Sequence, residues 1–200
     1  MSSRHLAGMS IYGWLIFVLW LTLVAYWGLS AAGVKRSIGS RWIWWREIAV
    51  RLAFFALVLL ASRVAVVGHL LPNALPYLFN TSTLAGVIGF VFCLFGIGLA
   101  ILGRAYLEQN WRMSLSGKEN PEPVTNGPYA IVRHPISSGM LLAMLGSAIG
   151  QSVFWLLPLI VYGPYFILSA RREERLLIEQ FPERYRAYMQ RTRMLLPFVL

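Results

Sequence analysis

The chain has 200 residues, of which 58% are hydrophobic and 13% are charged. Soluble domains contain about 25% charged and about 45–50% apolar residues, so this composition excludes an ordinary soluble domain. The net charge is +10, but the basic residues flank apolar runs of membrane-spanning length, which indicates topology signals and contacts with lipid headgroups rather than nucleic-acid binding.

The N-terminal half contains apolar runs long enough to cross a bilayer, for which about 20 residues are needed. We expect these spans at residues 10–32, 45–70 and 83–107. Arg63 lies within the second span, where it is either a functional intramembrane charge or a side chain that reaches the outer face. Glycines in the third span favour close packing against another helix, namely Gly86, Gly89, Gly96, Gly98 and Gly103.

The C-terminal half contains two further apolar runs and a charged tail. The runs at 136–150 and 153–170 predict a helical hairpin. Residues 171–193 predict a charged amphipathic helix, or a pair of helices interrupted at Pro182. The predicted fold class is therefore an all-α membrane protein with about five transmembrane helices, a C-terminal helical hairpin and an amphipathic tail.

The distribution of basic residues predicts the orientation in the membrane. Lys and Arg concentrate in segments 35–51 and 108–133 and in the C-terminal tail, whereas segment 68–82 contains neither. Because cytoplasmic loops carry the excess of positive charge, we expect the basic segments and the C-terminus in the cytoplasm. Five spans then place the N-terminus outside.

Side chains that bind metal ions are scarce. Cys93 is the only cysteine, so no disulfide can form within the chain. The three histidines, His5, His69 and His134, lie far apart, and the acidic residues are all glutamates. We therefore expect no metal site.

The most informative motif runs from Gly127-Pro128-Tyr129 to Arg133-His134-Pro135. Gly-Pro starts a turn, and Pro135 disfavours helical geometry at His134, so the second triplet is expected in an extended or turn conformation at a helix start. Backbone N–H groups at such a start can face a ligand. Taken alone, a helix-entry turn with a capping or solvated His134 explains the motif equally well.

A second cluster, Arg171-Arg172-Glu173-Glu174-Arg175, follows the last apolar run at the same predicted face. Its paired glutamates could bind a cation. Taken alone, an interfacial helix whose charges meet water and headgroups is the favoured interpretation.

In combination, these motifs resemble the isoprenylcysteine carboxyl methyltransferase family, within the broader group of membrane phospholipid methyltransferases. The matching order is Gly-Pro-Tyr, Arg-His-Pro, a short hairpin and Arg-Arg-Glu-Glu-Arg-Leu-Leu, followed by Phe181, Tyr185, Tyr188 and Pro197. The resemblance covers about residues 102–198, half of the chain. It implies a membrane-embedded helical enzyme of the prokaryotic type that uses S-adenosyl-L-methionine, with residues 1–107 as the N-terminal spans and 108–200 as the catalytic half.

The resemblance also implies a site. The expected cofactor-binding residues are Pro121, Glu122, Pro123, Val124, Tyr129, His134, Pro135, Ile136, Ser137 and Glu173. His134 and Glu174 are the catalytic candidates, since an amine or hydroxyl acceptor needs a general base, and Arg172 is expected to contact the substrate. The chain departs from the family pattern where Ser137 replaces the usual tyrosine and Pro121 a frequent histidine.

The implied reaction is methyl transfer to a lipophilic acceptor, such as an isoprenylcysteine-type carboxylate, at the cytoplasmic face of a bacterial inner membrane. The expected partners are a lipophilic small molecule or lipid substrate and the membrane lipids. Three alternatives remain open: a phospholipid amine acceptor, a small thiol acceptor, and a non-catalytic lipid-binding membrane protein with the same fold.

Overall fold

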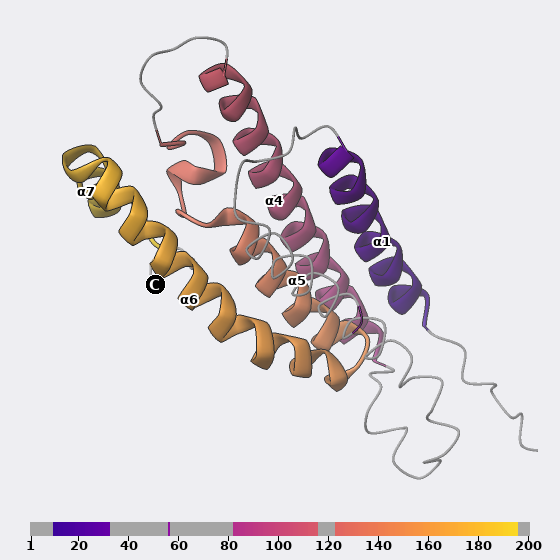
Figure 1. The fold of residues 1–200 in the computed structure, drawn as a ribbon. Coiled ribbons are helices and arrows are strands. Elements are labelled where there is room, and N and C mark those ends of the chain that lie inside the picture. Colours follow the sequence, from indigo (N-terminus) through magenta and orange to yellow (C-terminus); the bar gives the residue numbers. More distant parts are fainter. Residues whose placement is uncertain (1–9, 33–55, 57–81, 116–122, 196–200) are drawn as a thin grey trace, which may run out of the picture. The chain divides into compact units, whose positions relative to one another are not determined.

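The computed structural model describes residues 10–32, 56, 82–115 and 123–195 (Figure 1). These residues form helices and contain no β-strand, only one isolated bridge. In chain order the helices are α1 (Ile11–Ala32), α4 (Thr83–Leu115), the 3-10 helix η2 (Gly127–Ala130), α5 (Pro135–Gly150), the 3-10 helix η3 (Val153–Trp155), α6 (Leu156–Gln180) and α7 (Pro182–Arg191).

The described part of the chain contains three helices long and apolar enough to cross a membrane. These candidate spans are Ile11–Ser30, Thr83–Leu107 and Val153–Gln180, and α5 is a shorter apolar helix. Together, the three candidate spans and α5 coincide with four of the predicted apolar runs, so the all-helical membrane character is confirmed. The expected span at 45–70 lies outside the described residues except for residue 56, and the count of five spans stays a prediction.

Helix α6 is longer than the sequence predicts. The expected separate tail helix from residue 171 onwards begins instead as a continuation of α6, which ends at Gln180. Residues 171–180 are mostly arginine, glutamate, leucine and glutamine, which favour helix, and include no glycine or proline. The chain breaks at Phe181, and Pro182 takes the first position of α7, where proline is well tolerated.

The chain divides into two compact units, each described separately below. The first comprises Met1–Cys93 and Met144–Leu159, and the second comprises Leu94–Ala143 and Ile160–Leu200. The predicted division into residues 1–107 and 108–200 stays a prediction.

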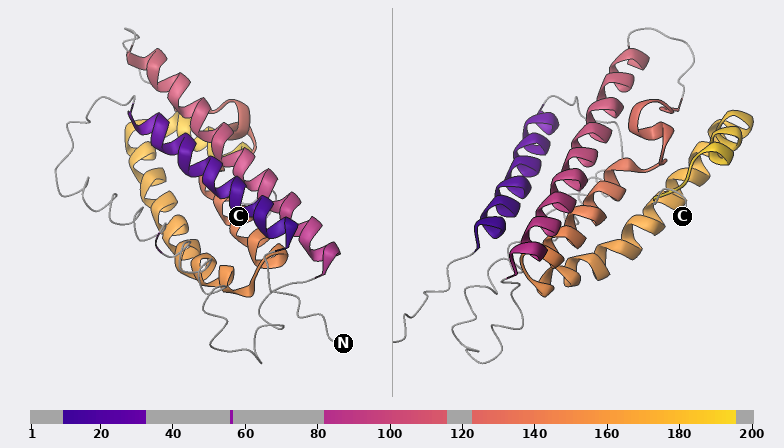
Figure 2. Two further views of the ribbon diagram at one scale, coloured as in Figure 1. Left: turned by 90° about the vertical axis from the view of Figure 1, so that its right-hand side faces the viewer. Right: turned by 180° about the vertical axis from the view of Figure 1, so that it is seen from behind.

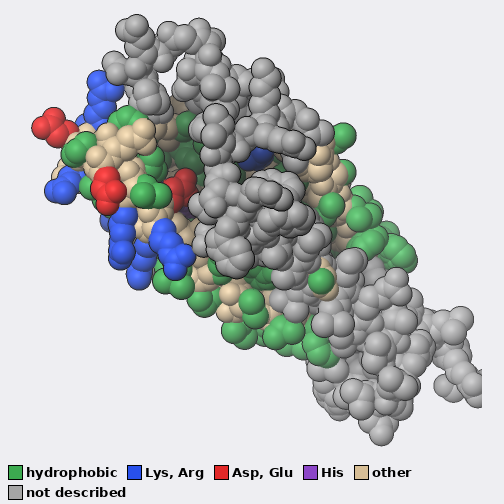
Figure 3. Space-filling model, in the orientation of Figure 1, with side chains coloured by type: hydrophobic (Ala, Val, Ile, Leu, Met, Phe, Trp, Pro, Cys, Tyr) green, Lys and Arg blue, Asp and Glu red, His purple; other side chains and the backbone are tan. Residues whose placement is uncertain are grey.

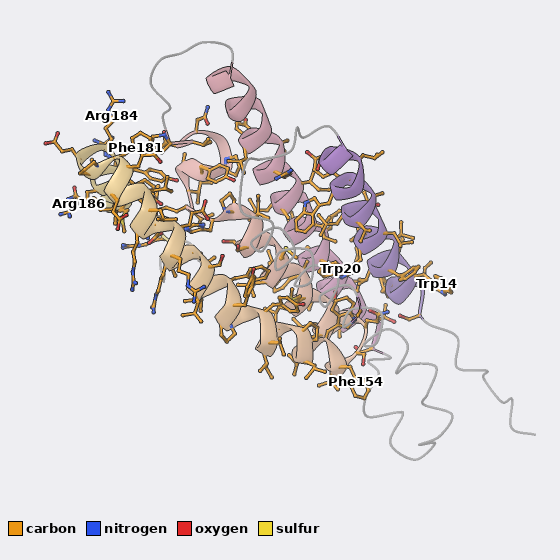
Figure 4. The ribbon with its side chains drawn as sticks, viewed as in Figure 1. Trp14, Trp20, Phe154, Phe181, Arg184 and Arg186 are labelled. Atoms are coloured by element: carbon orange, nitrogen blue, oxygen red, sulfur yellow. The ribbon has the colours of Figure 1, made fainter. Side chains whose placement is uncertain are left out.

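Polar side chains of the first unit pair with one another inside an apolar environment. Trp20 of α1 donates from Nε1 to the Ser147 hydroxyl at 3.0 Å, and its ring stacks on Trp155 with centroids 5.0 Å apart. Trp155 in turn donates to the Gln151 side chain at 2.7 Å. Hydrocarbon offers no water to polar groups, so such internal pairs hold the α5–α6 turn against α1. Trp14, by contrast, is 55% exposed and points away from the unit (Figure 4).

In the second unit, α4 and α5 lie side by side and touch through their backbones (Figure 2). A Cβ atom added at Gly96 would lie 2.5 Å from the Ala143 nitrogen and 2.5 Å from the Gly139 oxygen. Small residues permit this close approach, which in lipid replaces the hydrophobic driving force between helices. The predicted packing role of the glycines is thus met at Gly96, whereas a Cβ at Gly98 would meet nothing within 4 Å.

These two glycines give a matched test of the packing. We expect Gly96→Ala to lower stability by about 1–3 kcal/mol, because the added methyl group overpacks a backbone contact. Gly98→Ala should be neutral or stabilising by up to about 1 kcal/mol, because alanine favours helix over glycine. Thermal unfolding of the full chain in detergent measures both, and equal stability of the two variants would contradict the contact.

Candidate functional site

The motif residues of the second unit form an extended segment between η2 and α5. Gly127 has a φ of +59°, a left-handed conformation that favours glycine, and the ring of Tyr106 occupies the space where a Cβ would stand. Val132 forms a parallel bridge with Arg193 of the tail. The backbone nitrogen of His134 donates to the Met194 carbonyl at 3.1 Å. The segment before Pro135 is therefore held by the C-terminal tail.

Arg133 is the centre of the polar contacts at this segment. Its Nε donates to Glu174 Oε1 at 2.6 Å, and both side chains are 9% exposed. Its Nη1 donates to the carbonyls of Thr192 at 2.6 Å and of Met189 at 3.4 Å. One guanidinium thus joins the motif segment to α6, to α7 and to the tail.

His134 faces both glutamates of the second cluster. Its Nδ1 lies 3.6 Å from Glu173 Oε2 and its Nε2 lies 3.4 Å from Glu174 Oε1. The imidazole is 10% exposed, and Nε2 is buried without a hydrogen-bond partner among the described residues. Glu173, by contrast, has a side chain 64% exposed. The site therefore combines a buried ring nitrogen with an open carboxylate.

The tail after α7 packs into a small core beside this site. The Ser138 hydroxyl lies 3.0 Å from the His134 carbonyl and also contacts the carbonyl of Leu195. Leu195 and Met194 are buried with Ala170 of α6. The packing explains why the tail can hold the motif segment in place.

Two tyrosines link α4, η2 and α7. The Tyr188 hydroxyl donates to the Tyr129 carbonyl at 2.6 Å, and the Tyr129 hydroxyl donates to the Gly103 carbonyl at 3.3 Å. Burial raises the pKa of Tyr188 to about 12, with the charge of Arg133 opposing the shift. Burial, and to a smaller extent the charge of Glu173, also raises the pKa of Tyr129. Both phenols therefore stay protonated donors at neutral pH.

The structure brings some of the expected site residues together and leaves others apart. His134, Glu173 and Glu174 meet, as described above. Tyr129 and Pro135 are buried, Pro123, Val124, Ile136 and Ser137 are half-buried, Arg172 is exposed, and Pro121 and Glu122 lie outside the described residues.

Sequence reasoning assigned no role to Arg133 or to the tail at 192–195. The only signal for Arg133 was its place beside His134 in the motif. Nothing in the tail's composition marks it as a partner, because its contacts to the motif are made by backbone carbonyls.

The sequence of the chain matches one family profile and several known proteins. Residues 84–184 match the sequence profile of the family described as phospholipid methyltransferase. The chain is 33% identical over 101 residues to the cobalt-zinc-cadmium resistance protein CzcN of Cupriavidus metallidurans, which is 50% of this chain and 44% of that protein.

Two further relatives are named for a reaction. The methanethiol S-methyltransferase of Pseudomonas deceptionensis is 39% identical over 72 residues, 34% of this chain and 26% of that protein. Methanethiol S-methyltransferase 1 of Bradyrhizobium diazoefficiens is 35% identical over 95 residues, 42% of this chain and 30% of that protein. The chain thus spans less than half the length of these curated relatives.

Glu174 pairs with the buried Arg133, whereas Glu173 is exposed, so their substitution should affect stability differently. Glu174→Gln should lower the free energy of unfolding by about 3–5 kcal/mol, because it leaves the buried Arg133 charge uncompensated. Glu173→Gln, at an exposed side chain, should change it by less than about 0.5 kcal/mol. Thermal unfolding in detergent compares the two variants, and a larger loss for Glu173→Gln would show that the pairing with Arg133 is wrong.

Proposed function

The chain belongs to the phospholipid methyltransferase family, and from this premise we propose that it transfers a methyl group from S-adenosyl-L-methionine to a lipophilic acceptor. We place the reaction at the cytoplasmic face of a bacterial inner membrane. The observation that carries the proposal is the buried imidazole of His134. Its Nε2 makes no hydrogen bond among the described residues and lies 3.4 Å from Glu174, and its Nδ1 faces the open carboxylate of Glu173.

The chemistry of these side chains fits the cofactor. S-adenosyl-L-methionine bears two positive groups, a sulfonium and an ammonium, together with a carboxylate and ribose hydroxyls. An exposed glutamate suits a cation or a pair of hydroxyls, and a buried ring nitrogen that lacks a partner suits a polar ligand atom. Arg133 neutralises Glu174, so the charge of Glu173 is left as the net negative charge of the cluster.

Further contacts follow from the family pattern. We propose that the cofactor is held by the segment before η2, by Tyr129 and by the first turn of α5. The residues proposed for this role are Pro121, Glu122, Pro123, Val124, Tyr129, His134, Pro135, Ile136, Ser137 and Glu173. Arg172, exposed one position before Glu173, is proposed to contact the acceptor.

When bound, the cofactor supplies an electrophilic methyl group on a sulfonium whose positive charge is lost on transfer. The chain's contribution is to hold the reactants in position and to exclude water. The backbone of His134 is fixed by Met194, and its ring lies against Glu174, which Arg133 holds in turn. A carboxylate or thiolate acceptor needs no general base. For an amine or hydroxyl we propose that His134 accepts the proton at Nδ1, on the side of the open Glu173, and that Glu174 beside Nε2 orients the ring.

A small thiol is the second candidate acceptor, favoured by the two relatives that are named methanethiol S-methyltransferases. The two candidates give products that separate physically, because a methylated lipid stays in an organic extract and a methylated small thiol is volatile.

We expect the detergent-purified protein to bind S-adenosylhomocysteine in a calorimetric titration. His134→Ala and Glu173→Gln should each weaken binding roughly 10- to 150-fold, since a charge-assisted contact contributes about 1.5–3 kcal/mol. Glu179→Gln is the matched control, because it removes the same charge from an exposed position of the same helix. Absence of binding by the unaltered protein would instead support a non-catalytic lipid-binding protein.

We further expect label from methyl-labelled cofactor to appear in a non-volatile, organic-soluble product when membranes of the expressing cell supply the acceptor. A volatile labelled product formed only when methanethiol is added would favour the second candidate. The His134→Ala variant serves as the control for background transfer in both assays.

A further inference from the structure

A groove of about 530 Å³ lies in the second unit, between the segment before η2 and one face of α7. Four residues of α7 line it at helical spacing, which places them on one face of the helix. The complete lining is Pro123, Thr125, Ala130, Arg184, Ala187, Tyr188, Arg191 and Thr192. It contains neither His134 nor either of the paired glutamates, and of the residues proposed to hold the cofactor it shares Pro123 alone.

The charge of the groove is positive. Arg184 and Arg191 contribute guanidinium groups, and none of the described residues that line the groove is acidic. Arg191 forms no ion pair with any residue that the structure describes. The Tyr188 hydroxyl is already committed to the Tyr129 carbonyl, and the Thr192 hydroxyl to the Tyr188 carbonyl. The groups left to recognise a ligand are therefore the guanidinium of Arg191 and the exposed Thr125, and Arg184 adds a second positive charge to the lining.

The sign of this charge argues against the methyl donor as the occupant. The donor has a net positive charge, which two arginines repel and which the glutamates beside His134 attract. An oxyanion is instead attracted by the two arginines, because guanidinium groups bind phosphate through paired, charge-assisted hydrogen bonds.

The groove also lies where lipid headgroups are expected. The apolar run of α6 ends at Ala170, the charged last turns of the helix continue to Gln180, and Arg184 follows on α7. In Figure 3, basic side chains gather around α7 and the end of α6, whereas hydrophobic side chains cover α6 toward its start. Basic groups that directly follow a span attract anionic lipids.

We infer that this groove is a binding site for a phosphate group, and that its occupant is the headgroup of an anionic phospholipid. The volume lies within the range of small-molecule sites, about 300–1,000 Å³. The same helix holds Arg133 through the carbonyl of Met189, and Thr192 at its end accepts from that arginine. A phosphate in this groove therefore lies on the helix that contacts Arg133.

The test is native mass spectrometry of the full chain in detergent with added phosphatidylglycerol or phosphatidylcholine. The groove variant R184Q/R191Q is compared with R175Q/R186Q, which removes the same charge from exposed arginines outside the groove. Figure 4 shows Arg184 and Arg186 pointing in different directions from α7. We expect the groove variant to lose at least about tenfold in affinity for phosphatidylglycerol and the control to keep it, since each charged hydrogen bond contributes about 1.5–3 kcal/mol. Equal loss in both variants would overturn the site in favour of diffuse attraction, and so would unchanged affinity in the groove variant.

Inorganic phosphate distinguishes the source of the ligand. If phosphate alone displaces the lipid and raises the melting temperature of the unaltered protein but not of the groove variant, the site recognises phosphate from solution as well. If only the lipid binds, the membrane is the source. R191K keeps the charge but loses the planar fork, so it should bind more weakly than the unaltered protein while staying folded.

Titration with S-adenosylhomocysteine separates this site from the proposed cofactor site. We expect the groove variant to bind it as the unaltered protein does. Loss of that binding in R184Q/R191Q, with displacement of the lipid by S-adenosylhomocysteine, would assign the groove to the cofactor and overturn the inference.

Discussion

The buried contact between Arg133 and Glu174 is the interaction on which the rest of the candidate site depends. Its partners are 41 residues apart in the chain, and the same guanidinium binds a carbonyl 59 residues away. A charge removed from water is tolerated only with its counter-charge and its hydrogen bonds in place. The guanidinium is one rigid group that contacts both α6 and the tail. If α6 is absent, the charge of Arg133 has no counter-charge. If the tail is absent, its N–H groups lose their carbonyl acceptors. The position of His134 follows from that requirement, since its backbone and its ring are held by the same elements.

Hydropathy was sufficient to predict where the described apolar helices lie, because a bilayer demands long apolar runs whatever the function. It could not predict that α6 continues past the apolar run to Gln180, since local helix preference decides the end of a helix once it leaves the hydrocarbon. Nor could it distinguish the paired glutamates. Successive residues of a helix point about 100° apart, so one of two chemically identical neighbours is turned inward to Arg133 and the other outward to water. Which one is turned inward depends on the packing of α6, and the sequence pattern alone does not contain that information.

The electrostatics of the second unit separate two kinds of ligand. Glu173 leaves a net negative charge beside His134, which suits a cationic donor, whereas the arginine-lined face of α7 suits an oxyanion. The two regions are joined by short links, from Tyr188 to the Tyr129 carbonyl and from Arg133 to the Thr192 carbonyl. These links run through α7 and the tail, so the cluster around His134 and the groove both depend on the docking of α7.

The close packing of α4 against α5 gives the site its rigidity. Gly96 and Gly139 bring the two helices into backbone contact, and Gly103 lies against Pro135 and Ile136 at the start of α5. No flexible side chain separates the two backbones at this contact, so the helices cannot shift by changing rotamers. The first turn of α5 is therefore fixed relative to α4. The Tyr129 hydroxyl donates to the Gly103 carbonyl, so η2 is anchored to the same turn of α4. His134 lies between η2 and α5, both of which are anchored on α4, so helix packing holds its backbone while its ring lies against Glu174 of the Arg133–Glu174 pair. That double anchorage suits the methyl transfer proposed above, because an in-line reaction depends on positioning more than on any acid or base.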